Sequence, residues 1–221
     1  MTADFSLLIV CTGNVHRSAL AHDLLATWAG WYLPAALATR VHVVSAGTRA
    51  PVGVPMGGAT RRIAAELGAE DRGHRAALLT ADLVESADLI LASAREHRAA
   101  VLALSPRVLR RTFTIREAGR IATAMRPAAV HEDGAALSGR AARSAPSSVA
   151  SLCAAVVRLD ELRPDYLDPL ADDVIDPEGR EPAAVEEMVR QEVPALVELA
   201  RVLWGMPPGD VDAYLRAVAQ S

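Results

Sequence analysis

The sequence predicts an α/β protein, a three-layer fold in which helices cover both faces of a four-stranded parallel sheet. Short apolar runs alternate along the chain with segments of helical periodicity, which is the order that a parallel sheet requires. The runs are almost continuously hydrophobic, as strands buried on both faces are. The chain has 221 residues, 51% hydrophobic and 23% charged, which is a globular composition. We predict a single domain over residues 1–221, with an insertion at about 126–172.

Each secondary-structure element is predicted from its local pattern. Apolar runs predict four strands, of which the last is the weakest, at Phe5–Val10, Val41–Ser45, Asp88–Ala92 and Arg111–Thr114. Apolar residues at helical spacing predict helices at Ser18–Ala29, Pro55–Leu67, Ala94–Leu104, Ile115–Met125 and Pro182–Trp204. Within the last of these, Pro194 predicts a kink or a boundary.

The segment 126–172 interrupts the alternation of strands and helices. It is rich in Ala, Ser, Arg and Pro, and one extra helix is predicted within it at Ser151–Leu162. We interpret the segment as an insertion rather than as a second domain. After the last long helix, Pro207–Ser221 is predicted to form a loop and a peripheral helix.

Composition excludes several classes of function. The net charge of −4 indicates no broad basic face, so nucleic acid is not an expected partner. No apolar stretch approaches the roughly 20 residues of a membrane span, and no secretory signal precedes the first strand, so a cytoplasmic location is predicted. The two cysteines, Cys11 and Cys153, form no cluster with metal-ligand spacing. We therefore expect neither a metal nor a cofactor.

The segment after the first strand, residues 11–18, reads CTGNVHRS and has the features of an anion-binding loop. Its turn and the first turn of the next helix carry backbone N–H groups without intrahelical partners. If these groups converge, they bind an oxyanion at the positive end of the helix dipole. Gly13 and Asn14 accept the left-handed conformations that such a loop needs. Inorganic phosphate or sulfate is thus expected to contact Thr12, Gly13, Asn14, Val15, His16 and Ser18.

Cys11 lies at the floor of this predicted loop. The field that binds phosphate also favours thiolate, so we expect a lowered pKa and a reactive nucleophile. Arg17 is expected to grip two phosphate oxygens and to stabilise charge in the transition state. Ser18 is expected to cap the helix and to help the thiolate leave. A cysteine that ends a buried strand is usually just a small core residue, but the surrounding Gly, Asn, Arg and Ser favour the catalytic interpretation.

The loop CTGNxxRS resembles the signature of the low-molecular-weight protein tyrosine phosphatases of bacteria. Further segments resemble this family as well, at residues 45–48, 73–76, 87–91 and 172–177. The resemblance covers residues 5 to 204 except the insertion, which precedes the general-acid loop. It implies a hydrolase without metal or cofactor: the cysteine thiolate attacks phosphorus and forms a phosphocysteine, and an aspartate protonates the leaving phenol and then activates water.

Two Asp-Pro pairs compete for the role of general acid. The resemblance assigns it to Asp176, which follows Asp-Asp-Val-Ile and precedes the last long helix. Asp168 is interpreted as an ordinary turn residue. The resemblance also implies that a hydrogen-bond network supports the loop, formed by Asn14, Ser18, Ser45 and His74.

The chain departs from the family at two positions. His16 replaces the second cysteine of many members, which excludes a disulfide there. Glu178 stands where members often carry an aromatic residue, so a phosphotyrosine ring has fewer stacking partners. The leading hypothesis is a tyrosine phosphatase acting on phosphotyrosine proteins or small aryl phosphates. Two alternatives stay open: a catalytically weak phosphopeptide-binding regulator, and an arsenate reductase, which His16 disfavours because that reaction needs a second thiol.

Overall fold

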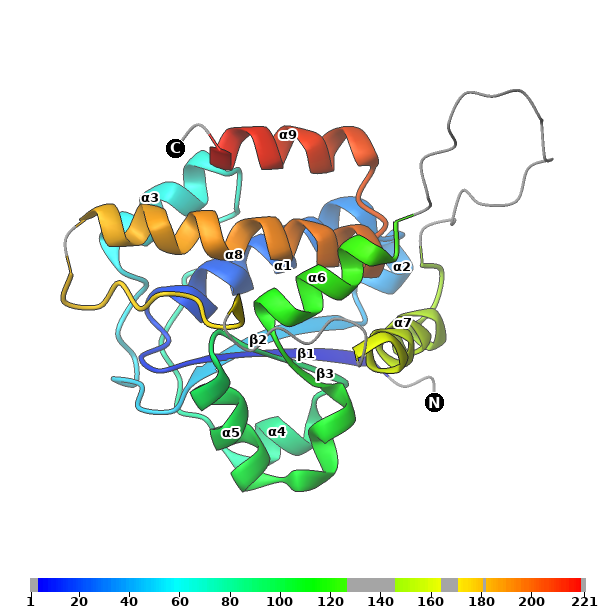
Figure 1. Ribbon diagram of the computed structural model, residues 1–221, viewed down its shortest axis with the longest axis horizontal. Helices are drawn as coiled ribbons and strands as arrows, with labels where there is room; N and C mark the ends of the chain where they lie inside the picture. The colour runs from blue at the N-terminus through cyan, green and yellow to red at the C-terminus, as the bar shows by residue number, and fades with distance from the viewer. Residues whose placement is uncertain (1–3, 127–145, 164–170, 181, 220–221) are drawn as a thin grey trace.

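The protein forms a parallel sheet between two layers of helices (Figure 1). The computed structural model describes residues 4–126, 146–163, 171–180 and 182–219. The sheet has the order β2-β1-β3-β4 and all its pairs are parallel. Its strands are β1 (Phe5–Cys11), β2 (Val41–Gly47), β3 (Leu89–Ala92) and β4 (Thr112–Thr114). The α/β prediction and all four strands are confirmed.

The central strand β1 carries the site at its end. Nearly all its residues are buried, because β2 and β3 flank it and helices cover both faces. The register pairs Cys11 with Gly47 and Val10 with Ala92. The carboxyl ends of three strands therefore meet at one edge, where ligands bind in open α/β sheets.

One face of the sheet carries the larger hydrophobic core. There Phe5, Leu7 and Ile9 pack against helices α1 (Arg17–Tyr32), α6 (Ile115–Ala124) and α8 (Pro182–Leu203). Elements around this core include α2 (Ala35–Ala38), α3 (Gly58–Glu66), α7 (Val149–Leu162) and α9 (Pro208–Ala219). The alternate residues Leu8 and Val10 point to the other face, which is covered by α4 (Ala81–Ser86), α5 (Arg95–Leu104) and the 3₁₀ helix η1 (Pro106–Arg111). The alternation follows from the two-residue period of a strand.

The long helix α8 is continuous through Pro194. Of the two alternatives predicted at that residue, the boundary is therefore wrong and the kink stays a prediction. The next residue, Ala195, packs against Gly119 of α6 so closely that a Cβ at 119 would overlap it. Sequence analysis also missed α2, α4 and η1, which are short. The division of the chain into one domain with an insertion stays a prediction, as does the cytoplasmic location. In the part of the chain that the structure describes, no helix is long and apolar enough to span a bilayer.

Candidate active site

Residues 11–18 wrap around the sulfur of Cys11 between the end of β1 and the start of α1. The backbone N–H of Asn14 donates to Sγ at 3.1 Å, and the Ser18 hydroxyl lies 2.9 Å from the same atom. Asn14 has a φ of 55°, whereas Gly13 does not take the left-handed conformation. Ser18 lies inside the first turn of α1 and the N-cap position is His16, so the predicted capping role of Ser18 is wrong. Its hydroxyl instead faces the sulfur.

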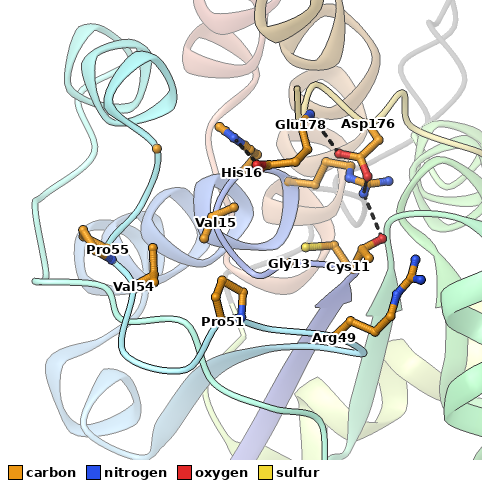
Figure 2. Close-up of a pocket in the computed structure, with 13 residues that line it drawn as sticks. Cys11, Gly13, Val15, His16, Arg49, Pro51, Val54, Pro55, Asp176 and Glu178 are labelled. Carbon is orange, nitrogen blue, oxygen red and sulfur yellow. Dashed lines mark hydrogen bonds and ion pairs between the residues drawn. The ribbon is translucent and has the colours of Figure 1, made fainter. Parts of the chain in front are cut away.

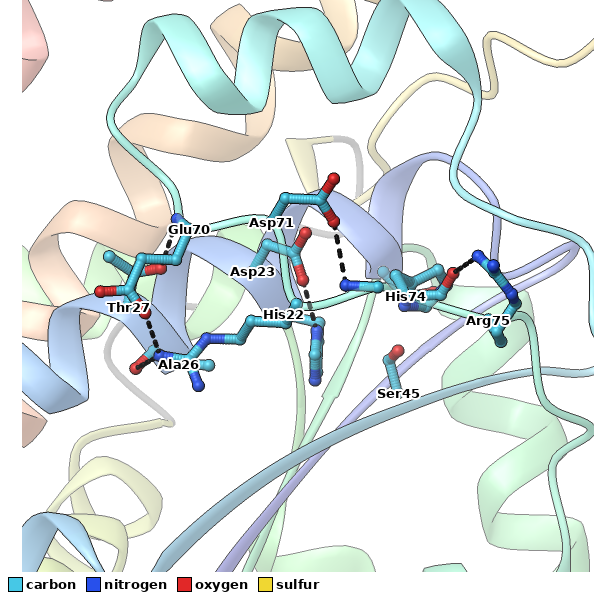
Figure 3. A network of polar contacts seen from close by, with 12 residues as sticks. His22, Asp23, Ala26, Thr27, Ser45, Glu70, Asp71, His74 and Arg75 are labelled. Carbon is cyan, nitrogen blue, oxygen red and sulfur yellow. Dashed lines mark hydrogen bonds and ion pairs between the residues drawn. The ribbon is translucent and has the colours of Figure 1, made fainter.

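Asn14 is the centre of the polar network that was predicted to support the loop. Its Nδ2 donates to the hydroxyls of Ser18 and Ser45 at 2.8 and 2.9 Å. Its Oδ1 accepts the N–H of Ala77 at 2.8 Å, and its carbonyl oxygen accepts from His74 Nε2 at 2.7 Å. Burial lowers the pKa of His74, which favours the neutral ring. Figure 3 shows Ser45 and His74 beside the polar residues of α1 and of the loop before His74.

Arg17 spans the rim of the loop and meets Asp176. Its side chain is buried, and Nη2 donates to Thr12 Oγ1 at 3.2 Å and to Asp176 Oδ2 at 2.5 Å. Its Nη1 donates to the carbonyl oxygen of Val174 at 3.4 Å. Cys11, Arg17 and Asp176 line one cavity of about 550 Å³, as Figure 2 shows for the cysteine and the aspartate. Asp168 lies outside the described residues.

The segment that carries Asp176 is held by three helices and by the residue that follows β3. The N–H of Val174 donates to the Ser93 carbonyl oxygen after β3, at 2.8 Å, and the N–H of Ile175 donates to Gln191 of α8 at 2.9 Å. Ion pairs anchor the two preceding residues, Asp172 to Arg120 of α6 and Asp173 to Arg95 of α5. Tertiary contacts thus bring a late segment of the chain to the loop after the first strand.

The pKa of Cys11 differs from the expectation. Burial raises the pKa of the thiol, while the Ser18 hydroxyl, the charge of Arg17 and the N–H of Asn14 lower it. Burial is the larger influence here, because the residue is only 2% exposed. Arg17 is also paired with Asp176, which offsets part of its positive field at the sulfur. The prediction of a lowered pKa is therefore wrong for this arrangement.

The mouth of the cavity combines an aliphatic wall with a polar one. Figure 2 shows Pro51, Val54 and Pro55 on one side and His16 and Glu178 on the other. Among the described residues that line it there is no Phe, Tyr or Trp. The stacking surface for an aromatic substrate therefore consists of aliphatic side chains and the imidazole of His16.

Sequence analysis missed His97, which supports the loop from α5. The residue is buried, and its Nε2 lies 2.9 Å from Thr12 Oγ1. Burial, aided by the charge of Arg17, lowers the pKa of His97 to about 4. The ring is thus neutral at neutral pH and shares a hydrogen bond with the Thr12 hydroxyl, whose oxygen also accepts from Arg17. No sequence signal distinguishes this histidine from an ordinary helix residue.

The second cysteine lies away from the cavity, and the described residues contain no cluster of metal-ligating side chains. Cys153 belongs to α7, which contacts β1 and lies near the beginning of that strand, at the opposite end from Cys11 (Figure 1). Within the described ranges, no three His, Cys, Asp or Glu side chains form a group that could hold a metal ion.

A cysteine at the floor of an anion-binding loop, with an arginine and a carboxylate above it, defines a class of phosphoryl-transfer site. The family model for the low molecular weight phosphotyrosine protein phosphatases matches residues 6–126, more than half of the chain. The protein belongs to this family of cysteine-dependent phosphatases. The match ends where the predicted insertion begins, so Asp176 lies beyond it.

Curated relatives agree with this assignment. Over 108 residues the chain is 38% identical to the low molecular weight protein-tyrosine-phosphatase Etp of Escherichia coli K12. The matched region covers 49% of this chain and 67% of Etp. The chain is 36% identical over 108 residues to the probable low molecular weight protein-tyrosine-phosphatase AmsI of Erwinia amylovora, covering 49% of this chain and 69% of AmsI.

Solved structures show the same fold over most of the chain. The tyrosine phosphatase AmsI of Erwinia amylovora matches 90% of this chain and 92% of its own, with 21% identity and a TM-score of 0.57. The YwlE arginine phosphatase from Geobacillus stearothermophilus matches 89% and 91%, with 22% identity and a TM-score of 0.56. At these identities the likeness concerns the fold alone. The fold thus occurs in phosphatases named for tyrosine and for arginine.

Proposed function

We propose that the protein hydrolyses phosphotyrosine in proteins, or small aryl phosphates, through a phosphocysteine on Cys11. The observation that carries the proposal is the position of Asp176, whose carboxylate lies 2.5 Å from Arg17 in the cavity above the cysteine. A general acid has to reach the leaving oxygen of a phosphate held at that arginine. Of the two described carboxylates that line the cavity, Asp176 and Glu178, Asp176 is the one in contact with Arg17, which supports this role.

In the first step the loop N–H groups and Arg17 bind the non-bridging oxygens of the phosphate. Binding replaces the Arg17–Asp176 ion pair by an Arg17–phosphate pair and releases the carboxyl group for proton transfer. The Cys11 thiolate attacks phosphorus, the bond to the ester oxygen breaks, and protonated Asp176 gives its proton to that oxygen. Arg17 and the amides stabilise the charge on the equatorial oxygens.

In the second step a water molecule attacks the phosphocysteine. Asp176 accepts a proton from the water, the S–P bond breaks, and inorganic phosphate is released. The Ser18 hydroxyl, 2.9 Å from Sγ, donates to the departing thiolate. The same contact and the N–H of Asn14 also favour the thiolate before attack, which offsets part of the cost of burying it.

Two observations favour this function over the alternatives. Asp176 lines the cavity, which a pure binding module does not need. Arsenate reduction needs a second thiol, and among the described residues Cys11 is the one cysteine that lines the cavity. The aliphatic wall of Val15, Pro51 and Val54 gives an aromatic ring an apolar surface against which to pack.

A kinetic panel tests the proposal. Wild type is expected to hydrolyse p-nitrophenyl phosphate and phosphotyrosine peptides faster than phosphoserine or phosphoarginine peptides. Cys11→Ser should abolish turnover, Asp176→Asn should lower kcat by about 10²–10⁴, and the matched cysteine control Cys153→Ser should retain activity. Protein that binds phosphate without turnover from pH 5 to 7.5 would instead be a binding module. Faster turnover of phosphoarginine peptides would move the substrate class to phosphoramidates.

A further inference from the structure

His16 connects three separate segments at the rim of the cavity. Its Nδ1 lies 2.7 Å from the Thr60 hydroxyl of α3, and its Nε2 lies 3.1 Å from Glu178 Oε2. Since both ring nitrogens have partners, either the neutral or the protonated ring can satisfy both contacts: the Thr60 hydroxyl donates to the neutral ring or accepts from the charged one. In each state the N–H on Nε2 points to the carboxylate of Glu178.

The ring of His16 is fixed by packing as well as by hydrogen bonds. Thr60 is fully buried, so its hydroxyl is a stationary partner. Gly57 lies against the imidazole so closely that a Cβ at this position would overlap the ring. The N–H of Gly57 donates to the carbonyl oxygen of Val15 at 2.9 Å, which holds this segment against the phosphate-binding loop. His16 is therefore a rigid point on the rim from which Glu178 can be held.

Glu178 in turn is coupled to the proposed general acid. Its backbone N–H donates to Asp176 Oδ1 at 3.2 Å, so the position of Glu178 influences the orientation of the Asp176 carboxyl group. The contacts to Ser93 and Gln191 hold the preceding residues, 174 and 175. Among the described residues, His16 is the side chain that holds the segment after Asp176 to the phosphate-binding loop.

We propose that His16 and Glu178 form a latch that positions Asp176 over the leaving-group oxygen once phosphate has displaced Asp176 from Arg17. This inference rests on the proposed function. While Asp176 is paired with Arg17, that ion pair fixes the carboxyl group. After phosphate has bound to Arg17, the backbone N–H of Glu178 keeps the Asp176 carboxyl group above the cavity, and the contact between the His16 and Glu178 side chains holds that N–H in place. The side chains of His16 and Glu178 thus position Asp176 without contact to the phosphate or the sulfur, whereas the backbone N–H of His16 stays part of the phosphate-binding loop.

The latch predicts an effect that depends on the leaving group. Phenolate is a poor leaving group that needs the proton of Asp176, whereas p-nitrophenolate leaves with little help. His16→Ala and Glu178→Ala should each lower kcat/KM for phenyl phosphate about tenfold and change kcat/KM for p-nitrophenyl phosphate far less, because kcat/KM reports the steps up to the departure of the leaving group and not the hydrolysis of the phosphocysteine. Inhibition by inorganic phosphate should stay unchanged, since the oxyanion is expected to contact the backbone N–H groups of the loop, which both substitutions keep.

Three further variants separate the latch from a general structural defect. The double variant should be no slower than either single one, because both substitutions break the same contact. Glu178→Gln keeps an acceptor oxygen for His16 and should recover most of the activity. Glu85→Ala removes an exposed carboxylate of α4, remote from the cavity, and should have no effect. Thermal unfolding of each variant shows whether it is folded.

Several results would overturn the latch. Equal losses of kcat/KM with both leaving groups, additive effects in the double variant, or no recovery in Glu178→Gln would each overturn the latch and leave the proposed function intact. A changed KM for basic peptides at constant kcat would make Glu178 a substrate contact instead. Wild-type protein that is inactive with both esters, or an Asp176→Asn variant as active as wild type, would overturn the proposed function and the latch together.

Discussion

Replacing Asn14 with alanine should destabilise the phosphate-binding loop severely. The substitution removes three side-chain hydrogen bonds, two donated to Ser18 and Ser45 and one accepted from Ala77. At about 1 kcal/mol each they account for about 3 kcal/mol. The left-handed φ of 55° at this position destabilises the alanine variant by about 1 kcal/mol more, because alanine has no polar side chain whose hydrogen bonds offset the strain. We expect a loss near 4 kcal/mol, a large part of the 5–15 kcal/mol that stabilises a typical domain.

Two matched variants separate these contributions. Asn14→Gly loses the same hydrogen bonds but tolerates the positive φ, so it should be about 1 kcal/mol more stable than Asn14→Ala. Asn14→Asp keeps an acceptor for the Ala77 N–H and can accept from both serine hydroxyls, and it should lie closer to wild type. Urea unfolding measures all three, provided that the m-value is constant. A loss below about 1.5 kcal/mol for alanine, or a glycine variant less stable than alanine, would refute the reasoning.

Two further predictions concern α8. Glu192 is fully buried, neither of its oxygens has a partner among the described residues, and burial raises its pKa well above the usual 4.5, against the opposing charge of Arg17. The folded state thus holds a proton on Glu192 that the unfolded chain releases, so the free energy of unfolding falls as pH rises above about 4.5, by up to about 1.4 kcal/mol per pH unit. Glu192→Gln removes this titration and should therefore gain stability relative to wild type between pH 5 and 8 in denaturant titrations. A stability difference that does not change with pH would contradict this. In Gly119→Ala the new Cβ would overlap Ala195 and push α6 away from α8, which should lower the free energy of unfolding by about 1–3 kcal/mol. This loss should exceed the ~1 kcal/mol by which alanine favours the helix over glycine. The Tm of this variant should fall, whereas the control Gly209→Ala, with open space around it in α9, should hold or raise Tm; equal shifts would contradict the packing argument.

The general position of the site could be predicted because its main parts are local in sequence. A continuous apolar run predicts β1, and the loop that follows it contains the cysteine, the left-handed asparagine and the arginine within eight residues, 11–18. Asp176 was assigned from the resemblance to the family, because its Asp-Pro pair before a long helix matches the family's general-acid segment. The structure places it in the cavity with Cys11 and Arg17, while its role as general acid stays a proposal.

Other features depend on contacts that no local pattern encodes. His97 looks like any helix residue until burial sets its pKa and Thr12 becomes its partner. Glu178 was identified only as a missing aromatic, and its contact with His16 joins segments far apart in the chain. The direction of the Cys11 pKa was wrong because a sequence shows the nearby donors but not the loss of solvent.

By itself, the sequence determined the order of the four strands and of the longer helices, the position of the cysteine-containing loop after the first strand, and the family. Hydrophobic periodicity and short-range backbone geometry act within a few residues, so a sequence displays them directly. Only the tertiary structure decided which distant carboxylates reach the rim, how deeply the sulfur is buried and which histidines have buried partners. Those properties depend on long-range packing, and hydration and Coulomb interactions change with burial and distance in space rather than with separation along the chain.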